Sequence, residues 1–144
     1  MSTTTAAVGI ESLAMLTLVV DDFEDALEFY VDTLGFEKRS DEPYEFEGGE
    51  GRWVTVGLPG DALDISLARP DEEFYDEATR QALSGMQGKL WWTFRTEDCE
   101  ASVDALEAAD VEITQPPTEY PWGVEAMFAD PFGNEFSLFE FAEN

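Results

Sequence analysis

The order of predicted elements occurs twice along the chain, and this repetition limits the possible folds more than any other feature. The first copy combines apolar strand patterns with one helix of three- and four-residue apolar spacing. Its elements are a strand at 13–20, a helix from Asp22 to Gly35, and strands at 36–47, 52–57 and 63–68. Those of the second copy are a strand at 90–96, a helix at 99–109, and strands at 111–115, 124–129 and 135–141.

The two copies align when Asp22 is superposed on Asp98, since each aspartate can accept hydrogen bonds from the first amides of a helix. Residue identity is sparse, but the classes of residue match, which indicates an internal duplication. We expect one α+β domain over residues 1–144, made of module 10–69 and module 88–142. The connection 70–87 is more polar and contains a possible short helix within 72–83.

The charge of the chain is unusual. Asp and Glu number 33 against 7 Lys and Arg, and without histidine the formal net charge is -26. Such self-repulsion destabilises a compact state in dilute buffer, whereas concentrated salt screens it. Because the acidic residues are spread along the whole chain, we expect a halophilic, acidic protein with a cytoplasmic location. An acidic protein without salt adaptation is the alternative.

The composition also argues against several partners. Lys38 and Arg39 are the only adjacent basic residues, so no basic patch for nucleic acid is predicted. Cys99 is the single cysteine, which excludes an intrachain disulfide and suits a reducing compartment. No apolar run approaches the length of a membrane span, so we expect no membrane partner.

Strand side chains alternate between the two faces of a sheet, which divides each predicted strand into two sets. One set is apolar and is expected under the helices: Leu16, Leu18, Val20, Leu63, Ile65, Leu67, Trp92, Phe94, Phe136 and Leu138. The other set mixes aromatic, hydroxyl and acidic side chains: Met15, Thr17, Asp64, Ser66, Trp91, Thr93, Ser137 and Phe139. Such a mixture is typical of a concave binding surface. A packed interior or a contact between two copies is the alternative.

Two segments, "LVVDDFEDALEFYVDTLGF" and "DPFGNEFSLFE", resemble the vicinal oxygen chelate superfamily, which includes glyoxalase I, bleomycin resistance proteins, fosfomycin resistance enzymes and extradiol dioxygenases. The resemblance extends from Leu13 to Glu140. It implies two βαβββ modules that form a curved mixed sheet around a cavity, and it implies a homodimer. The repeated order of elements agrees with that fold.

Catalytic members of the superfamily bind a divalent cation through His, Glu or Gln on the first and last strands of each module. The matching positions here are Met15, Asp64, Trp91 and Ser137. Only Asp64 is a good ligand for such a cation, because a thioether and a neutral hydroxyl bind it weakly and an indole offers no lone pair. We therefore expect no cofactor and no metal at these positions. A displaced metal held by Glu125 or another of the many carboxylates is the alternative.

The leading hypothesis is a small-molecule binding protein of the glyoxalase/bleomycin-resistance type without the usual metal site. Aromatic side chains would stack on a planar or cationic ligand, and Asp64 would anchor a cation. The expected pocket residues are Met15, Thr17, Trp53, Asp64, Ser66, Trp91, Thr93, Trp122, Glu125, Phe128, Ser137 and Phe139.

Two other functions stay open. One is a lyase, isomerase or dioxygenase of the same superfamily, with Asp64 or Glu125 as general base. The other is a dimeric scaffold that binds no ligand. The sequence does not decide whether the protein is an enzyme, and it assigns no catalytic residue.

Overall fold

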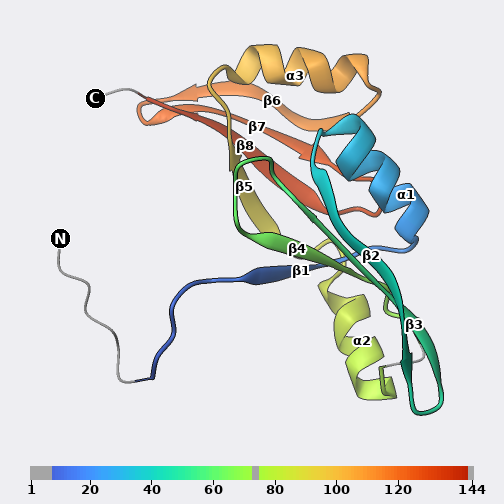
Figure 1. Ribbon diagram of the computed structural model, residues 1–144. Coiled ribbons are helices and arrows are strands. Elements are labelled where there is room, and N and C mark those ends of the chain that lie inside the picture. The colour runs from blue at the N-terminus through green and yellow to red at the C-terminus, as the bar shows by residue number, and fades with distance from the viewer. Residues whose placement is uncertain (1–7, 73–74, 143–144) are drawn as a thin grey trace.

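The computed structural model describes residues 8–72 and 75–142. Figure 1 shows two βαβββ modules, joined in the chain by a segment that contains a further helix. The first module contains β1 (Met15–Val19), α1 (Phe23–Leu27), η1 (Glu28–Thr33), β2 (Glu37–Phe46), β3 (Gly49–Gly57) and β4 (Asp64–Ala68). After α2 (Glu77–Met86), the second contains β5 (Trp91–Arg95), α3 (Cys99–Ala108), β6 (Glu112–Tyr120), β7 (Gly123–Ala129) and β8 (Glu135–Phe141).

Each module forms one four-stranded mixed sheet. The strand order is β1-β4-β3-β2 in the first sheet, called sheet A here, and β5-β8-β7-β6 in the second, called sheet B. β1 runs parallel to β4, and β5 runs parallel to β8, whereas the other neighbours are antiparallel. This arrangement confirms the α+β fold predicted from the repeated order of elements.

The first helix differs from the single α-helix that the apolar spacing predicts. Asp22 caps α1 as expected, and its carboxylate accepts the Asp25 amide at 2.9 Å. From Glu28 onward the chain widens into the π-helix η1, with the Leu34 amide bonded to the Phe29 carbonyl at 2.9 Å. A π turn adds one residue to the helical repeat, a change that apolar spacing does not reveal. Gly35, at φ +85°, ends the helix as predicted.

The connection between the modules also contains a helix, α2, which begins later than predicted. Residues 73 and 74 of the expected helix lie outside the described residues. Asp76 caps α2, with its carboxylate accepting the Thr79 amide at 2.8 Å. Among the described residues, no helix is both long and apolar enough to cross a membrane.

One hydrophobic core joins both modules. Most of the predicted apolar set lies there: Leu18, Val20, Ile65, Leu67, Phe136 and Leu138 are buried, and Trp92 and Phe94 pack against them. Leu16 and Leu63, near the starts of β1 and β4, are only half-buried and lie outside this core. The Phe36 ring, just before β2, meets the Phe94 ring of β5 edge-on, with centroids 5.9 Å apart. Aromatic contacts of this kind add to the free energy gained by burial, so each module stabilises the other.

A buried polar cluster, made of Tyr30, Asp130 and Asn134, lies where the modules meet. The Tyr30 hydroxyl of η1 donates to Asp130 Oδ2 at 2.6 Å. The Asn134 side chain donates to the Val19 carbonyl at 2.9 Å and to Asp130 Oδ2 at 2.9 Å, and its oxygen accepts the Gly88 amide at 2.8 Å. Burial and the neighbouring Asp130 charge raise the pKa of Tyr30, which keeps its hydroxyl a donor. The "DPFGN" turn therefore connects the two halves of the molecule.

Candidate functional site

The sheet face opposite the core is called the pocket face here. In sheet A, strand register places Met15 beside Asp64 and Thr17 beside Ser66. In sheet B, Thr93 lies beside Ser137. These neighbours alternate with core residues, as predicted, so the division of strand side chains into two faces is correct for both sheets.

The strand register changes one detail of the expected metal positions. Met15 pairs with Asp64, but the matching pair in sheet B is Trp91 with Glu135. Ser137 instead occupies the row that corresponds to Ser66. The four positions chosen from the motif therefore come from two different rows.

Asp64 is held by Arg39, a residue that the sequence analysis did not include in the site. Arg39 Nη1 contacts Asp64 Oδ1 at 2.8 Å, and the same guanidinium donates to the carbonyl oxygens of Leu58 and Asp61. The guanidinium crosses Gly57, where a Cβ would overlap it. Arg39 thus holds the loop between β3 and β4, and the charge of Asp64 is already matched by a cation.

Ser137 and Glu125 form the corresponding polar contact in sheet B. Ser137 is fully buried, and its hydroxyl donates to Glu125 Oε2 at 2.5 Å. Glu125 lies on the neighbouring strand β7, on the same face, two residues before Met127, which is the register partner of Ser137. The hydroxyl that stands at the expected metal position is therefore bound to a carboxylate of its own sheet.

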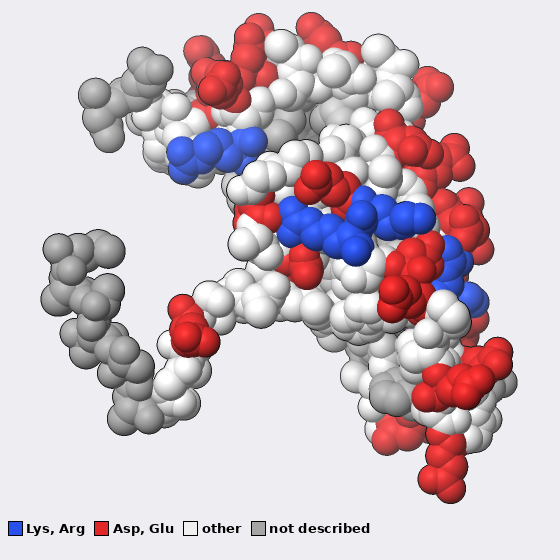
Figure 2. Space-filling model, in the orientation of Figure 1, with Lys and Arg blue, Asp and Glu red and all other residues white. Residues whose placement is uncertain are grey.

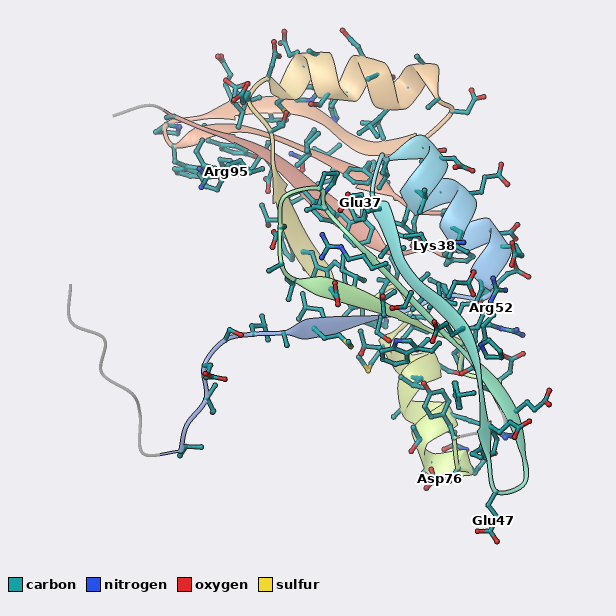
Figure 3. The ribbon with its side chains drawn as sticks, viewed as in Figure 1. Glu37, Lys38, Glu47, Arg52, Asp76 and Arg95 are labelled. Carbon is teal, nitrogen blue, oxygen red and sulfur yellow. The ribbon has the colours of Figure 1, made fainter. Side chains whose placement is uncertain are left out.

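Aromatic side chains form one end of the pocket face of sheet B. The Phe139 and Phe141 ring centroids are 4.5 Å apart, and the Arg95 guanidinium lies 4.6 Å from the Phe141 centroid. Figure 3 shows Arg95 at this end of the sheet. Trp91, at the other end of β5, keeps 71% of its surface exposed. The exposed aromatic rings on this face of sheet B can stack on a flat or cationic group.

Two residues expected in the pocket lie elsewhere. Phe128 is buried in the core and stacks on Phe94, with centroids 6.2 Å apart. Alternation along β7 explains this, because Phe128 and Glu125 are an odd number of residues apart and face opposite sides. Trp122 lies in the turn between β6 and β7 and stacks on Tyr120 at 5.2 Å, and alternation does not apply to a turn.

The residues present do not fit a divalent cation. In the row that the strand register defines, Asp64 is bound to Arg39, Met15 and Trp91 offer no hard oxygen or imidazole, and Glu135 is the one other carboxylate. The Ser137 hydroxyl, in the next row, donates to Glu125. In the part of the chain that the structure describes, no group of three or more His, Cys, Asp or Glu side chains is placed to hold a metal ion.

A pocket that the sequence analysis missed lies on the pocket face of sheet A. This pocket, called the tyrosine pocket here, has a volume of about 350 Å³. Its lining residues are Tyr44, Arg52, Trp53, Ser66, Leu67, Glu72 and Tyr75. Trp53 and Ser66 were predicted. Gly51 was the feature of the sequence that could have indicated Tyr44, because a glycine within a strand often marks a close approach by another group, and Gly51 lies directly opposite Tyr44 in the register.

The fold and the pocket faces define a glyoxalase-type protein, and comparison with known proteins agrees. The model of the Glyoxalase/Bleomycin resistance protein/Dioxygenase superfamily matches residues 12–138. The chain belongs to this superfamily.

Individual relatives cover most of the chain. The crystal structure of UcmS2 is 32% identical, has a TM-score of 0.79, and covers 91% of this chain and 98% of its own. The structure of TnmS3, an antibiotic binding protein from Streptomyces sp. CB03234, is 29% identical with a TM-score of 0.73, covering 92% and 98%. An uncharacterized protein from Shewanella frigidimarina is 30% identical and covers 90% of this chain and 93% of its own.

Proposed function

We propose that the protein binds a small molecule on its pocket face and uses no metal ion to do so. The observation that carries this proposal is the state of the two polar groups at the expected metal positions. Asp64 is matched by Arg39, and the Ser137 hydroxyl is bound to Glu125. Aromatic side chains and hydroxyls remain to contact a ligand, which is the usual composition of a small-molecule site. The similarity to TnmS3, an antibiotic binding protein, supports the same reading.

Titration with a panel of planar polycyclic compounds is expected to change the tryptophan fluorescence in a saturable way, with the same curve before and after treatment with EDTA. Trp53→Ala is expected to weaken binding about fivefold, because stacking on a partly exposed indole contributes on the order of 1 kcal/mol. Trp122→Ala is the matched control, since that indole lies in a turn outside the pocket face. A panel without any response, or binding that needs Mn, Ni or Zn, would contradict the proposal.

We further propose that the protein is a homodimer in which a second copy covers part of the pocket face. Trp91 is 71% exposed, Phe141 is 48% exposed and Met15 is 37% exposed, so the face has more apolar surface than an isolated ligand site needs. The edge strands β1 and β5 also each have one neighbour in their sheets. A symmetric contact through the same patch on both copies would cover this surface.

Light scattering after size-exclusion chromatography is expected to give twice the chain mass of 16.1 kDa. Trp91→Arg is expected to give the single-chain mass, because it places a charge within the apolar surface of the proposed contact. Trp122→Ala is expected to leave the dimer intact. A single-chain mass for the unchanged protein at tens of micromolar would refute the dimer.

We also propose that the protein is adapted to a salt-rich cytoplasm. Figure 2 shows carboxylates over the helices and the β2–β3 hairpin, whereas the surface over β1 is mostly uncharged. On this side of the molecule, the acidic residues that contribute to the net charge of -26 are spread over several elements. This distribution supports an adaptation of the whole surface to salt and not a single acidic binding patch.

A further inference from the structure

The tyrosine pocket is built from three strands and the segment that follows them. Tyr44 comes from β2, Trp53 from β3 and Ser66 from β4, while Glu72 and Tyr75 come from the chain between β4 and α2. Trp53 is 41% exposed, so its indole can be reached from solvent. The pocket therefore combines three aromatic side chains with one carboxylate.

A strand glycine sets the position of one of these rings. Gly51 lies opposite Tyr44 in the register of β2 and β3. A Cβ at Gly51 would overlap the far end of the Tyr44 ring, so the ring lies across the glycine. Gly51 has no positive φ, which means that the absent side chain matters here for the close approach of the ring and not for the backbone conformation.

The basic side chains near the tyrosine pocket are paired with other carboxylates, so Glu72 is the charged group that faces the pocket. The Arg52 side chain points away, toward the α1 side of the sheet (Figure 3), where it contacts Asp41 at 2.7 Å and Glu24 at 2.6 Å. Arg69 is paired with Asp71 at 2.8 Å. Within residues 8–72 and 75–142, no Lys or Arg side chain forms an ion pair with Glu72.

Electrostatics inside the pocket agree with this geometry. Burial raises the pKa of Glu72 above its usual value, although the Arg52 backbone and the Arg69 charge act in the opposite direction. Burial and the Glu72 charge also raise the pKa of the Tyr44 and Tyr75 hydroxyls. A half-buried carboxylate beside aromatic rings creates a negative potential, which the faces of the rings reinforce.

We infer that the tyrosine pocket binds the positively charged end of an organic ligand, a protonated or quaternary ammonium group carried on an apolar or aromatic body. This inference rests on the proposed small-molecule function and names the ligand class for it. The ammonium group would lie between Glu72 and the two tyrosine rings, with the body of the ligand on Trp53. A volume of about 350 Å³ suits such a group and not a bare metal ion, which needs several hard ligands. Asp64, the cation anchor expected from the sequence, is already paired with Arg39.

The test compares benzyltrimethylammonium with its neutral isostere neopentylbenzene and with the anion benzylsulfonate, by calorimetry on the full-length protein. The cation is expected to bind at least tenfold more tightly than the isostere, and the anion is expected not to bind. Glu72→Gln is expected to weaken cation binding about tenfold and to leave binding of the isostere unchanged. Glu50→Gln, an equal change of charge on an exposed residue of β3, is the matched control and is expected to have less than a twofold effect.

A second variant keeps the inference testable if Glu72→Gln fails to fold. Gly51→Ala leaves every charge in place but displaces the Tyr44 ring, and it is expected to weaken cation binding severalfold. Equal binding of the cation and the neutral isostere, or an equal loss in the Glu72→Gln and Glu50→Gln variants, would overturn the inference. If planar neutral compounds bind and the cation does not, the small-molecule function stands and the ammonium site is refuted. If no compound binds, both are refuted.

Discussion

Asn134→Ala is expected to lower the free energy of unfolding by about 4 kcal/mol, which corresponds to a fall in Tm of roughly 10 °C for a domain of this size. The substitution removes the donor to the Val19 carbonyl and to Asp130, and the acceptor of the Gly88 amide. All of these groups belong to the junction between the modules, where Asn134 itself is fully buried. The large effect follows because buried polar groups that lose their partners pay the full desolvation cost.

Urea unfolding followed by circular dichroism measures this loss, with two variants for comparison. Tyr30→Phe removes one hydrogen bond and leaves Asp130 with its other donors, so we expect a smaller loss of about 2 kcal/mol. Gln81→Ala deletes an amide on the exposed surface of α2, where the side chain contacts Glu77 at 3.1 Å, and is expected to cost less than about 0.5 kcal/mol. Similar losses for Asn134→Ala and Gln81→Ala would mean that the polar cluster does not connect the modules.

Raising potassium chloride from 0.1 M to 2 M is expected to stabilise the folded protein by on the order of 5 kcal/mol. The cause is the net charge of -26, which repels itself more strongly in the compact state than in the expanded chain. At 0.1 M the Debye length of about 10 Å leaves much of this repulsion in place, and above 1 M it falls below about 3 Å. Thermal unfolding across a salt series measures the effect.

A charge-reduced variant separates screening from the general effect of cosolutes on folding. Changing four exposed carboxylates to amides, Glu45, Glu47, Asp104 and Glu107, is expected to raise Tm at low salt and to flatten the dependence on salt. Sucrose, which stabilises folded proteins without screening charge, is expected to act equally on both proteins. A Tm that does not change between 0.1 M and 2 M salt would rule out the proposed adaptation.

Much of the fold could be predicted because its signals are local. Asp22 and Gly35 mark the two ends of the first helix, and alternation assigns Leu18, Ile65 and Phe136 to the core without any knowledge of their partners. The widened turn at η1 was not predictable, because a π turn leaves no mark in the apolar spacing, and the Tyr30 hydroxyl within it bonds to Asp130, a residue far away in the chain. Local patterns describe each element but not its contacts with residues far away in the chain.

The candidate site was less predictable for the same reason. Nothing in the sequence around Lys38 and Arg39 indicates a partner for Arg39. Its contact with Asp64 depends on how β4 packs in the folded sheet. Glu72 and Tyr75 come from an irregular connection, to which neither alternation nor helical spacing applies. Phe128 was a different kind of error, since its position relative to Glu125 in the same strand already assigns it to the opposite face.

The position of the buried polar cluster has a consequence for how such chains could evolve. Its hydrogen bonds join Val19 and Tyr30 of one half to Asp130 and Asn134 of the other, and only the Gly88 amide comes from the region of the connecting chain. Recognition between the halves is thus nearly independent of how they are linked. Two polypeptides that exchanged their C-terminal halves would form the same bonds, so a change of linker length alone could convert a self-contained chain into an intertwined pair without a new contact.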